Sequence, residues 1–345
     1  MKNTDTKRVA EIDSIRGIAA LMIVFYHYTI RYQKLFESRV TFPEWLCIGR
    51  YGIGVFFIIS GFGIFYSLEH LSSLRSFWEK RFWRLYPTYW LCLFLTAAAV
   101  AAGLPERQVT LREFVINLSM IQYGLQVTAV DSASWTLFFE LLFYAHISVI
   151  WLLKLQHEMQ YVALAWVAGA LLNILYPVKI LAVLLDYKYG MLFLAGIGFY
   201  HLYYRIGSKI LWIAITAVCC ALNIRQGGTH PLSANLLIFG VFYCVAFRKL
   251  FRLRSAFLAE VGALSYALYL LHQNIGYAII KNVTARWGWN PLCAASLAFA
   301  VVLLLAWLIH HYFEKRLLPV WSRHVNDRID RMIEASRGAF RRHRS

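Results

Sequence analysis

Apolar segments close to the length of a membrane span recur along the whole 345-residue sequence. A helix needs roughly 20 predominantly apolar residues to cross the hydrocarbon core of a bilayer. The sequence therefore predicts an all-α integral membrane protein, a polytopic bundle of about ten transmembrane helices. The predicted spans cover residues 14–31, 50–67, 86–103, 133–153, 161–177, 187–204, 208–223, 233–247, 258–280 and 291–312.

The composition agrees with a single membrane domain. Hydrophobic residues make up 60% of the chain, whereas soluble domains are usually less than half apolar. The six cysteines include no Cys-x-x-Cys pair, which argues against a zinc site or a disulfide framework. The net charge of +17 lies in short loops and the C-terminal tail, so we expect no nucleic-acid partner.

The distribution of positive charge predicts the topology. With both termini cytoplasmic, roughly two thirds of the 35 lysines and arginines fall in inner segments, including Lys2, Lys7 and Arg8. We therefore expect an even number of spans. Residues 1–320 form the predicted transmembrane domain, and residues 321–345 form a basic cytoplasmic tail that contacts anionic lipid.

Arg16 and His27 lie eleven residues apart in the first apolar segment. Eleven steps make about three helical turns, so both side chains share one face and are roughly 16 Å apart along the axis. Ionisable residues inside a membrane span are costly and usually face a pocket or pathway. This spacing predicts a cation near the inner end and a proton-transfer group in the outer half of the membrane.

Two further polar residues, Glu140 and His272, are predicted near the depth of His27. Glu140 lies about seven residues below the outer end of its span, and His272 reaches a similar level in another. Tyr269 shares a helix face with His272, and Ser134 is expected at the outer mouth. Histidines with a carboxylate suit general acid–base chemistry, although the same residues could only hold helices together by hydrogen bonds.

Arg81 and Arg84 form a basic cluster at the inner end of the third span. They lie about one turn apart on one helix face within the segment 80–89, KRFWRLYPTY. Paired guanidinium groups suit phosphate recognition. Simple anchoring by positive charge on the cytoplasmic side is the alternative.

The ordered set of these segments resembles the acyltransferase 3 family of multispan membrane acyltransferases. The matching segments are 12–20 (IDSIRGIAA) with His27, 56–62 (FFIISGF), 80–89 (KRFWRLYPTY), 134–140 (SWTLFFE), 265–272 (SYALYLLH) and 312–314 (YFE). The resemblance implies transfer of an acyl group, usually acetyl, from cytoplasmic acyl-CoA to a hydroxyl on a glycan. It places the functional residues at Arg16, His27, Arg81, Arg84 and Glu140. Lys80 stands where the family often has an arginine.

The resulting hypothesis is an O-acetyltransferase of the bacterial cytoplasmic (inner) membrane. Arg16, Arg81 and Arg84 would bind acetyl-CoA, and no metal is expected. His27 would act as general base or carry the acyl group, with Glu140 orienting it. Ser134, Tyr269 and His272 would contact the acceptor, a cell-surface polysaccharide or its lipid-linked precursor. A transporter or flippase for a polar lipid or glycan is the main alternative, and a scaffold subunit is the other.

Overall fold

A computed structural model describes residues 9–37, 42–179, 182, 185, 189–225, 232–249 and 253–342. Within these residues the chain is helical and contains no strand, which confirms the all-α class. The longer helices are α1 (Ala10–Tyr26), α3 (Gly52–Glu69), α4 (Leu74–Gly103), α6 (Trp135–Leu152), α7 (Met159–Leu175), α9 (Gly190–Tyr204), α10 (Lys209–Arg225), α11 (Leu232–Ala246), α12 (Ala256–Trp287), α13 (Pro291–Leu308) and α14 (Leu318–Arg342). The shorter elements are η1 (His27–Arg31), α2 (Tyr32–Phe36), η2 (Glu44–Tyr51), η3 (Pro105–Arg107), α5 (Leu111–Asn117), η4 (Ser132–Ser134), η5 (Gln156–Glu158) and η7 (Ile309–Leu317).

A helix overlaps each of the ten predicted spans. Five described segments are long and apolar enough to cross a membrane by length and composition, so the chain is a membrane protein. These segments are Glu44–Glu69, Leu74–Gly103, Ser132–Leu152, Gln156–Leu175 and Pro291–Met332. The number of spans and the side of each terminus stay predictions. Residues 187 and 188 of the sixth predicted span, and Lys2, Lys7 and Arg8, lie outside the described residues.

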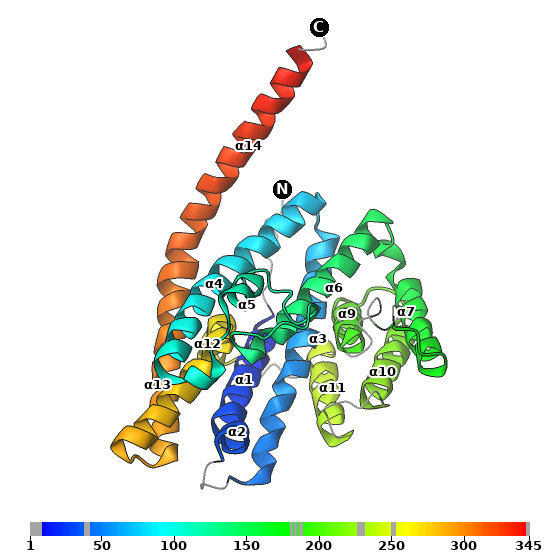
Figure 1. Cartoon of the computed structure of the whole chain (residues 1–345). Helices are drawn as coiled ribbons and strands as arrows, with labels where there is room; N and C mark the ends of the chain where they lie inside the picture. Colours follow the sequence, from blue (N-terminus) through cyan, green and yellow to red (C-terminus); the bar gives the residue numbers. More distant parts are fainter. Residues whose placement is uncertain are drawn as a thin grey trace.

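Two helices extend further than the apolar pattern predicts. α4 begins at Leu74 rather than near residue 86, because Ser73 caps it by accepting a hydrogen bond from the Ser76 amide at 3.2 Å. The basic cluster therefore lies inside the helix. At the other end of the chain, α13 continues through the π-helix η7 into α14, which projects beyond the rest of the bundle (Figure 1).

Reciprocal glycine contacts bring two pairs of helices together. A Cβ atom on Gly17 of α1 would lie 2.2 Å from the Leu258 carbonyl oxygen, and one on Gly262 of α12 would lie 2.1 Å from that of Asp13. Gly61 of α3 and Gly196 of α9 form a similar crossing, with 2.1 Å to backbone oxygens on each side. Small residues that allow backbones to approach closely are the usual means of packing membrane helices.

α12 is the helix around which the site is built. It packs against α1, α4 and α13, and its contact with α1 is the most extensive among the described elements. From the crossing at Gly17 and Gly262 the two helices run in parallel, so that His27 of η1 meets His272 of α12. α3 joins this group to α7, α9, α10 and α11, which lie together on the other side of the bundle (Figure 1).

Candidate active site

His27 and His272 form a hydrogen-bonded pair in the interior of the bundle. Nδ1 of His27 lies 3.2 Å from Nε2 of His272, and the ring centroids are 4.7 Å apart. The sequence predicted a common depth for the two residues, and the structure brings them into contact. His27 also begins η1, a π-helical turn, and such turns occur frequently at functional sites.

The α1–α12 interface fixes the position of His272. The Tyr28 hydroxyl donates to the carbonyl oxygen of His272 at 2.8 Å. The Tyr28 ring fits over Gly276, where a Cβ atom would lie 2.2 Å from the ring. His272 itself is fully buried. The backbone that carries this imidazole is therefore held by one tyrosine and by the absence of a side chain at Gly276.

Hydrogen bonding determines the tautomers of the neutral pair. Nδ1 of His272 lies 2.7 Å from the Tyr269 carbonyl oxygen, which can only accept, so Nδ1 carries the proton and Nε2 is an acceptor. Nδ1 of His27 must then donate, because it faces this Nε2 and the Ile23 carbonyl oxygen at 2.9 Å. The lone pair of His27 is left on Nε2. This arrangement gives a general base whose second nitrogen is oriented by hydrogen bonds.

The His27 side chain is partly accessible, although protein atoms surround it. Nε2 is not among the fully buried polar atoms without partners. Nε2 of this base therefore has no hydrogen-bond partner among the described residues and is not sealed from contact.

Glu140 lies away from the histidine pair. Its carboxylate accepts hydrogen bonds from the Tyr144 hydroxyl and from Ser60 Oγ, the latter at 3.4 Å, and lies within electrostatic range of Arg81. No hydrogen bond or ion pair joins it to His27 in the described chain. The orienting contact expected from Glu140 is made instead by His272. Equal depth along two spans did not mean that both side chains point toward each other.

Arg81 and Arg84 occupy different environments at the same end of the bundle. Arg81 is buried, donates to Ser67 Oγ at 2.9 Å, and leaves its Nε without a partner. Its guanidinium lies 5.7 Å from the centroid of the Tyr144 ring. Arg84 is exposed and lies within electrostatic range of Arg81 and Tyr144. These two cations mark what we call the donor end.

Arg16 joins α1 to α12 in this structure. Its guanidinium pairs with Asp13 at 2.9 Å and donates from Nε to the Gly262 carbonyl oxygen at 2.8 Å. It is thus engaged at the glycine crossing. To contact a phosphate, the Arg16 guanidinium would have to leave the Asp13 carboxylate or bind both groups at once.

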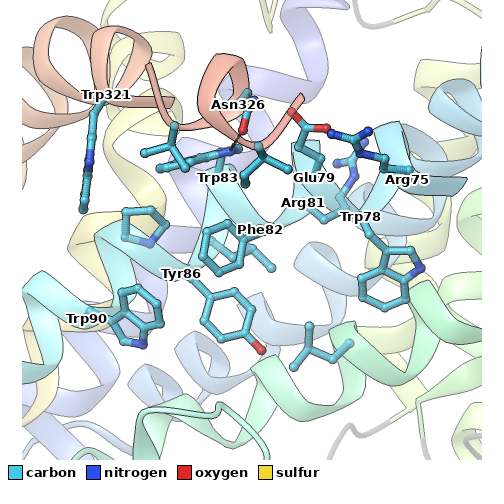
Figure 2. A pocket seen from close by; sticks show the side chains of 15 residues that line it. Arg75, Trp78, Glu79, Arg81, Phe82, Trp83, Tyr86, Trp90, Trp321 and Asn326 are labelled. Atoms are coloured by element: carbon cyan, nitrogen blue, oxygen red, sulfur yellow. Dashed lines mark hydrogen bonds between the residues drawn. The ribbon is translucent and has the colours of Figure 1, made fainter. Parts of the chain in front are cut away.

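A cavity of about 810 Å³ lies between α4, α6 and α14, next to Arg81. Figure 2 shows its aromatic wall, formed by Trp78, Phe82, Trp83, Tyr86 and Trp90 of α4 with Trp321 of α14. Arg75, Glu79 and Arg81 gather at one edge. Asn326 accepts a hydrogen bond from the Trp83 indole at 3.1 Å. The cavity thus combines apolar aromatic faces with a charged edge.

Ser134 and Tyr269 connect the start of α6 to α12. Ser134 is buried, donates to the Asp131 carbonyl oxygen at 2.7 Å and accepts from Gln122 at 2.9 Å. Tyr269 donates to the Ala133 carbonyl oxygen at 2.7 Å and keeps part of its surface accessible. Ser134 therefore has partners within the protein, whereas Tyr269 lies beside His272 with ring centroids 5.6 Å apart.

Asp131 is a buried carboxylate beside this group. Its two oxygens accept from the backbone amides of Ala133 and Asn274 at 2.8 and 3.1 Å. Burial raises the pKa of Asp131 to about 6, and these two amides oppose the rise. The amide partners of Asp131 lie on η4 and α12, which no sequence spacing connects.

The fold assembles other polar groups that the predicted site did not include. Arg31 and Arg107 lie within electrostatic range of His27. At the junction of α13 and η7, His310 Nδ1 lies 2.6 Å from Glu314, whose other oxygen accepts from Thr88 of α4 at 3.0 Å. The spacing of His310 and Glu314, one helical turn, was the available signal. Arg107 ends the three-residue element η3, whose sequence gave no such signal.

Comparison with known proteins identifies one family model and several related proteins. The family model described as an acyltransferase domain, acyltransferase 3, matches residues 9–311. The chain is 28% identical over 148 residues to the acyltransferase MdmB of Streptomyces mycarofaciens, covering 40% of this chain and 38% of that protein. It is 33% identical over 118 residues to the exopolysaccharide production protein ExoZ of Rhizobium meliloti (strain 1021), covering 32% of this chain and 37% of that protein.

The matched regions span less than half the length of these relatives. No solved structure matches the chain. The family match, in contrast, covers most of the sequence, from the start of α1 to the π-helix η7. The histidine pair, the buried Arg81 and the α1–α12 crossing all lie within it. The chain belongs to the acyltransferase 3 family.

Proposed function

We propose that the protein is a membrane O-acyltransferase that moves an acetyl group from acetyl-CoA to a hydroxyl of a cell-surface polysaccharide or its lipid-linked precursor. The observation that carries this proposal is the histidine pair, whose hydrogen bonds leave Nε2 of His27 as a base without a partner among the described residues. The similarity to ExoZ, an exopolysaccharide production protein, supports a glycan acceptor. We place the protein in the bacterial cytoplasmic membrane, with the donor end toward the cytoplasm.

In the direct route, Nε2 of His27 removes the proton of the acceptor hydroxyl. The resulting oxygen attacks the thioester carbonyl carbon, and the carbon–sulfur bond breaks. The CoA thiolate leaves and takes up the proton from the imidazolium. His272 Nε2 accepts from His27 Nδ1 throughout and so stabilises the charged ring. An acyl-imidazole formed first on His27 and then attacked by the acceptor is the alternative route.

The donor end supports binding of acetyl-CoA. We propose that Arg81 and Arg84 contact its phosphates, with Arg16 adding positive charge. The cavity beside Arg81 is lined by aromatic rings on which an adenine can stack. Glu140 and Tyr144 lie next to Arg81 and hold its guanidinium in place. From this end the pantetheine arm would extend toward Tyr269 and His27.

Acetyl transfer is tested directly with purified protein in lipid nanodiscs and radiolabelled acetyl-CoA. We expect label to move to added membrane glycan or, without acceptor, release of CoA by slow hydrolysis. Mass spectrometry of surface glycans from wild-type and deletion cells then identifies the ester. Movement of a glycan lipid across proteoliposomes without ester formation would instead support a transporter, and no turnover of either kind would support a scaffold.

Replacement of Arg84 by alanine is expected to raise the KM for acetyl-CoA at least about tenfold, because a charge-assisted phosphate contact contributes roughly 1.5–3 kcal/mol. The kcat and the KM for the acceptor should change little. The matched control is Arg112→Ala, which removes an exposed arginine on α5. An unchanged KM for acetyl-CoA, or an equal rise in the control, would contradict a phosphate site at Arg84.

A further inference from the structure

Two arginines and a tyrosine lie close to His27: Arg31 on the same element, Tyr277 on the helix of His272, and Arg107 on a separate segment. Arg31 ends η1, Arg107 ends η3, and both guanidinium groups lie within electrostatic range of the His27 imidazole. Arg107 lies over the Tyr277 ring, 5.5 Å from its centroid. The Tyr277 ring is 6.4 Å from that of His27. Three segments thus place two cations and a phenol beside the proposed base.

Neither arginine of this group forms an ion pair within the described chain, and the carboxylates of Asp131 and Glu106 lie only within electrostatic range of Arg107. Arg31 forms no hydrogen bond or ion pair with a described residue, and Arg107 forms no ion pair with one. The nearby Glu106 pairs with Lys281 at 2.7 Å, which lowers the pKa of that carboxyl. Asp131 directs both oxygens to backbone amides. Two guanidinium charges are therefore available to a bound molecule.

Tyr277 provides an independent sign of a missing partner. Its side chain is fully buried, and its hydroxyl makes no hydrogen bond in the described structure. Nearly all buried polar groups in proteins have a partner, because leaving one unsatisfied is costly. A ligand oxygen that accepts from the Tyr277 hydroxyl would satisfy it. The same oxygen, or its neighbour, would face Arg107.

We propose that the acceptor carries an anionic group, a carboxylate or a phosphate, on the sugar that is acylated or on its immediate neighbour. Arg31, Arg107 and Tyr277 would bind this group while the hydroxyl meets Nε2 of His27. Planar guanidinium groups bind both oxyanions in a bidentate manner. The inference rests on the proposed function for the role of the ligand, but the anion site itself can be tested without turnover.

The test is equilibrium binding to the full-length protein in detergent. Three probes share one sugar: p-nitrophenyl β-glucoside, its 6-phosphate, and p-nitrophenyl β-glucuronide. We expect an anionic probe to bind at least about tenfold more tightly than the neutral glucoside. Arg31→Gln and Arg107→Gln should each remove most of this preference without weakening binding of the glucoside. Tyr277→Phe should reduce it less, since the phenylalanine keeps the packing.

Lys34→Gln is the matched control, because it removes an exposed cation on α2 one turn from Arg31. Its preference for anionic probes should equal that of the wild type. No preference in the wild type, or an equal loss in the control, overturns the inference, even if acetyl transfer is observed. A preference that depends on Arg31 and Arg107 in a protein without acetyl transfer supports the anion site and counts against the proposed function. The relative affinities of the glucuronide and the 6-phosphate distinguish a sugar acid from a sugar phosphate.

Discussion

The variant His27→Ala is expected to lose acetyl transfer by about 10²–10⁴-fold, the usual contribution of a general base. The reason is that Nε2 of His27 is the ring nitrogen of the pair left without a proton or a hydrogen-bond partner, whereas both nitrogens of His272 are engaged. The loss should fall on kcat rather than on the KM for acetyl-CoA. It is measured by CoA release and by labelled ester in nanodiscs, with expression and thermal unfolding as checks on folding.

The control for this prediction is His70→Ala. His70 is an exposed histidine whose Nδ1 lies 2.9 Å from the Tyr66 carbonyl oxygen, four residues earlier, which is the same local contact that His27 makes with Ile23. It differs in having no second imidazole beside it. The control should keep full activity. Transfer by the His27 variant at near wild-type rate would remove the imidazole from the mechanism.

Replacement of Gly61 by alanine is expected to destabilise the fold by roughly 1–3 kcal/mol or more, the usual cost of overpacking a core. The added Cβ atom would lie 2.1 Å from the Phe193 carbonyl oxygen, and Gly196 of α9 approaches from the same side. A backbone atom held in a helix cannot rotate away as a side chain can. We therefore expect α3 and α9 to separate, which lowers the thermal unfolding temperature in detergent and the yield of folded protein.

Gly63→Ala provides a close control on the same helix. Nothing lies within 4 Å of a Cβ atom at Gly63, which is exposed. Alanine also favours the helix over glycine by up to about 1 kcal/mol. This variant should be as stable as the wild type or more so. Equal effects at the two positions would show that helix propensity, and not the crossing with α9, determines the result.

The sequence predicted most of the helices because each span is long and apolar by itself. It also predicted the common level of His27 and His272, since the rise per residue converts sequence position into depth. Depth along the bundle is only one of the coordinates that define the position of a side chain. The direction in which a side chain points across the bundle depends on which helices are neighbours. For this reason Glu140 was expected beside His27, whereas the structure places it with Tyr144 and Arg81.

The contacts of single polar residues also could not be predicted from the sequence. Arg16 was expected to face a phosphate, but the glycine crossing brings the Gly262 carbonyl oxygen within its reach. Arg107 comes from a short loop element without periodicity, and its position over Tyr277 depends on how α4 and α12 pack. Such contacts arise from tertiary packing, which the spacing of residues along the sequence does not reveal.

The crossing of the parallel helices α1 and α12 fixes the position of the two imidazoles relative to each other. His27 and His272 each follow their glycine, Gly17 or Gly262, by ten residues, or about 15 Å of helix. Over this distance, a change of about 5° in the angle between the two helix axes would move one ring relative to the other by more than about 1 Å. Their 3.2 Å contact would not survive such a shift. The geometry for proton transfer therefore depends on the angle between α1 and α12. This angle is set at the crossing of Gly17 and Gly262, where neither helix has a side chain.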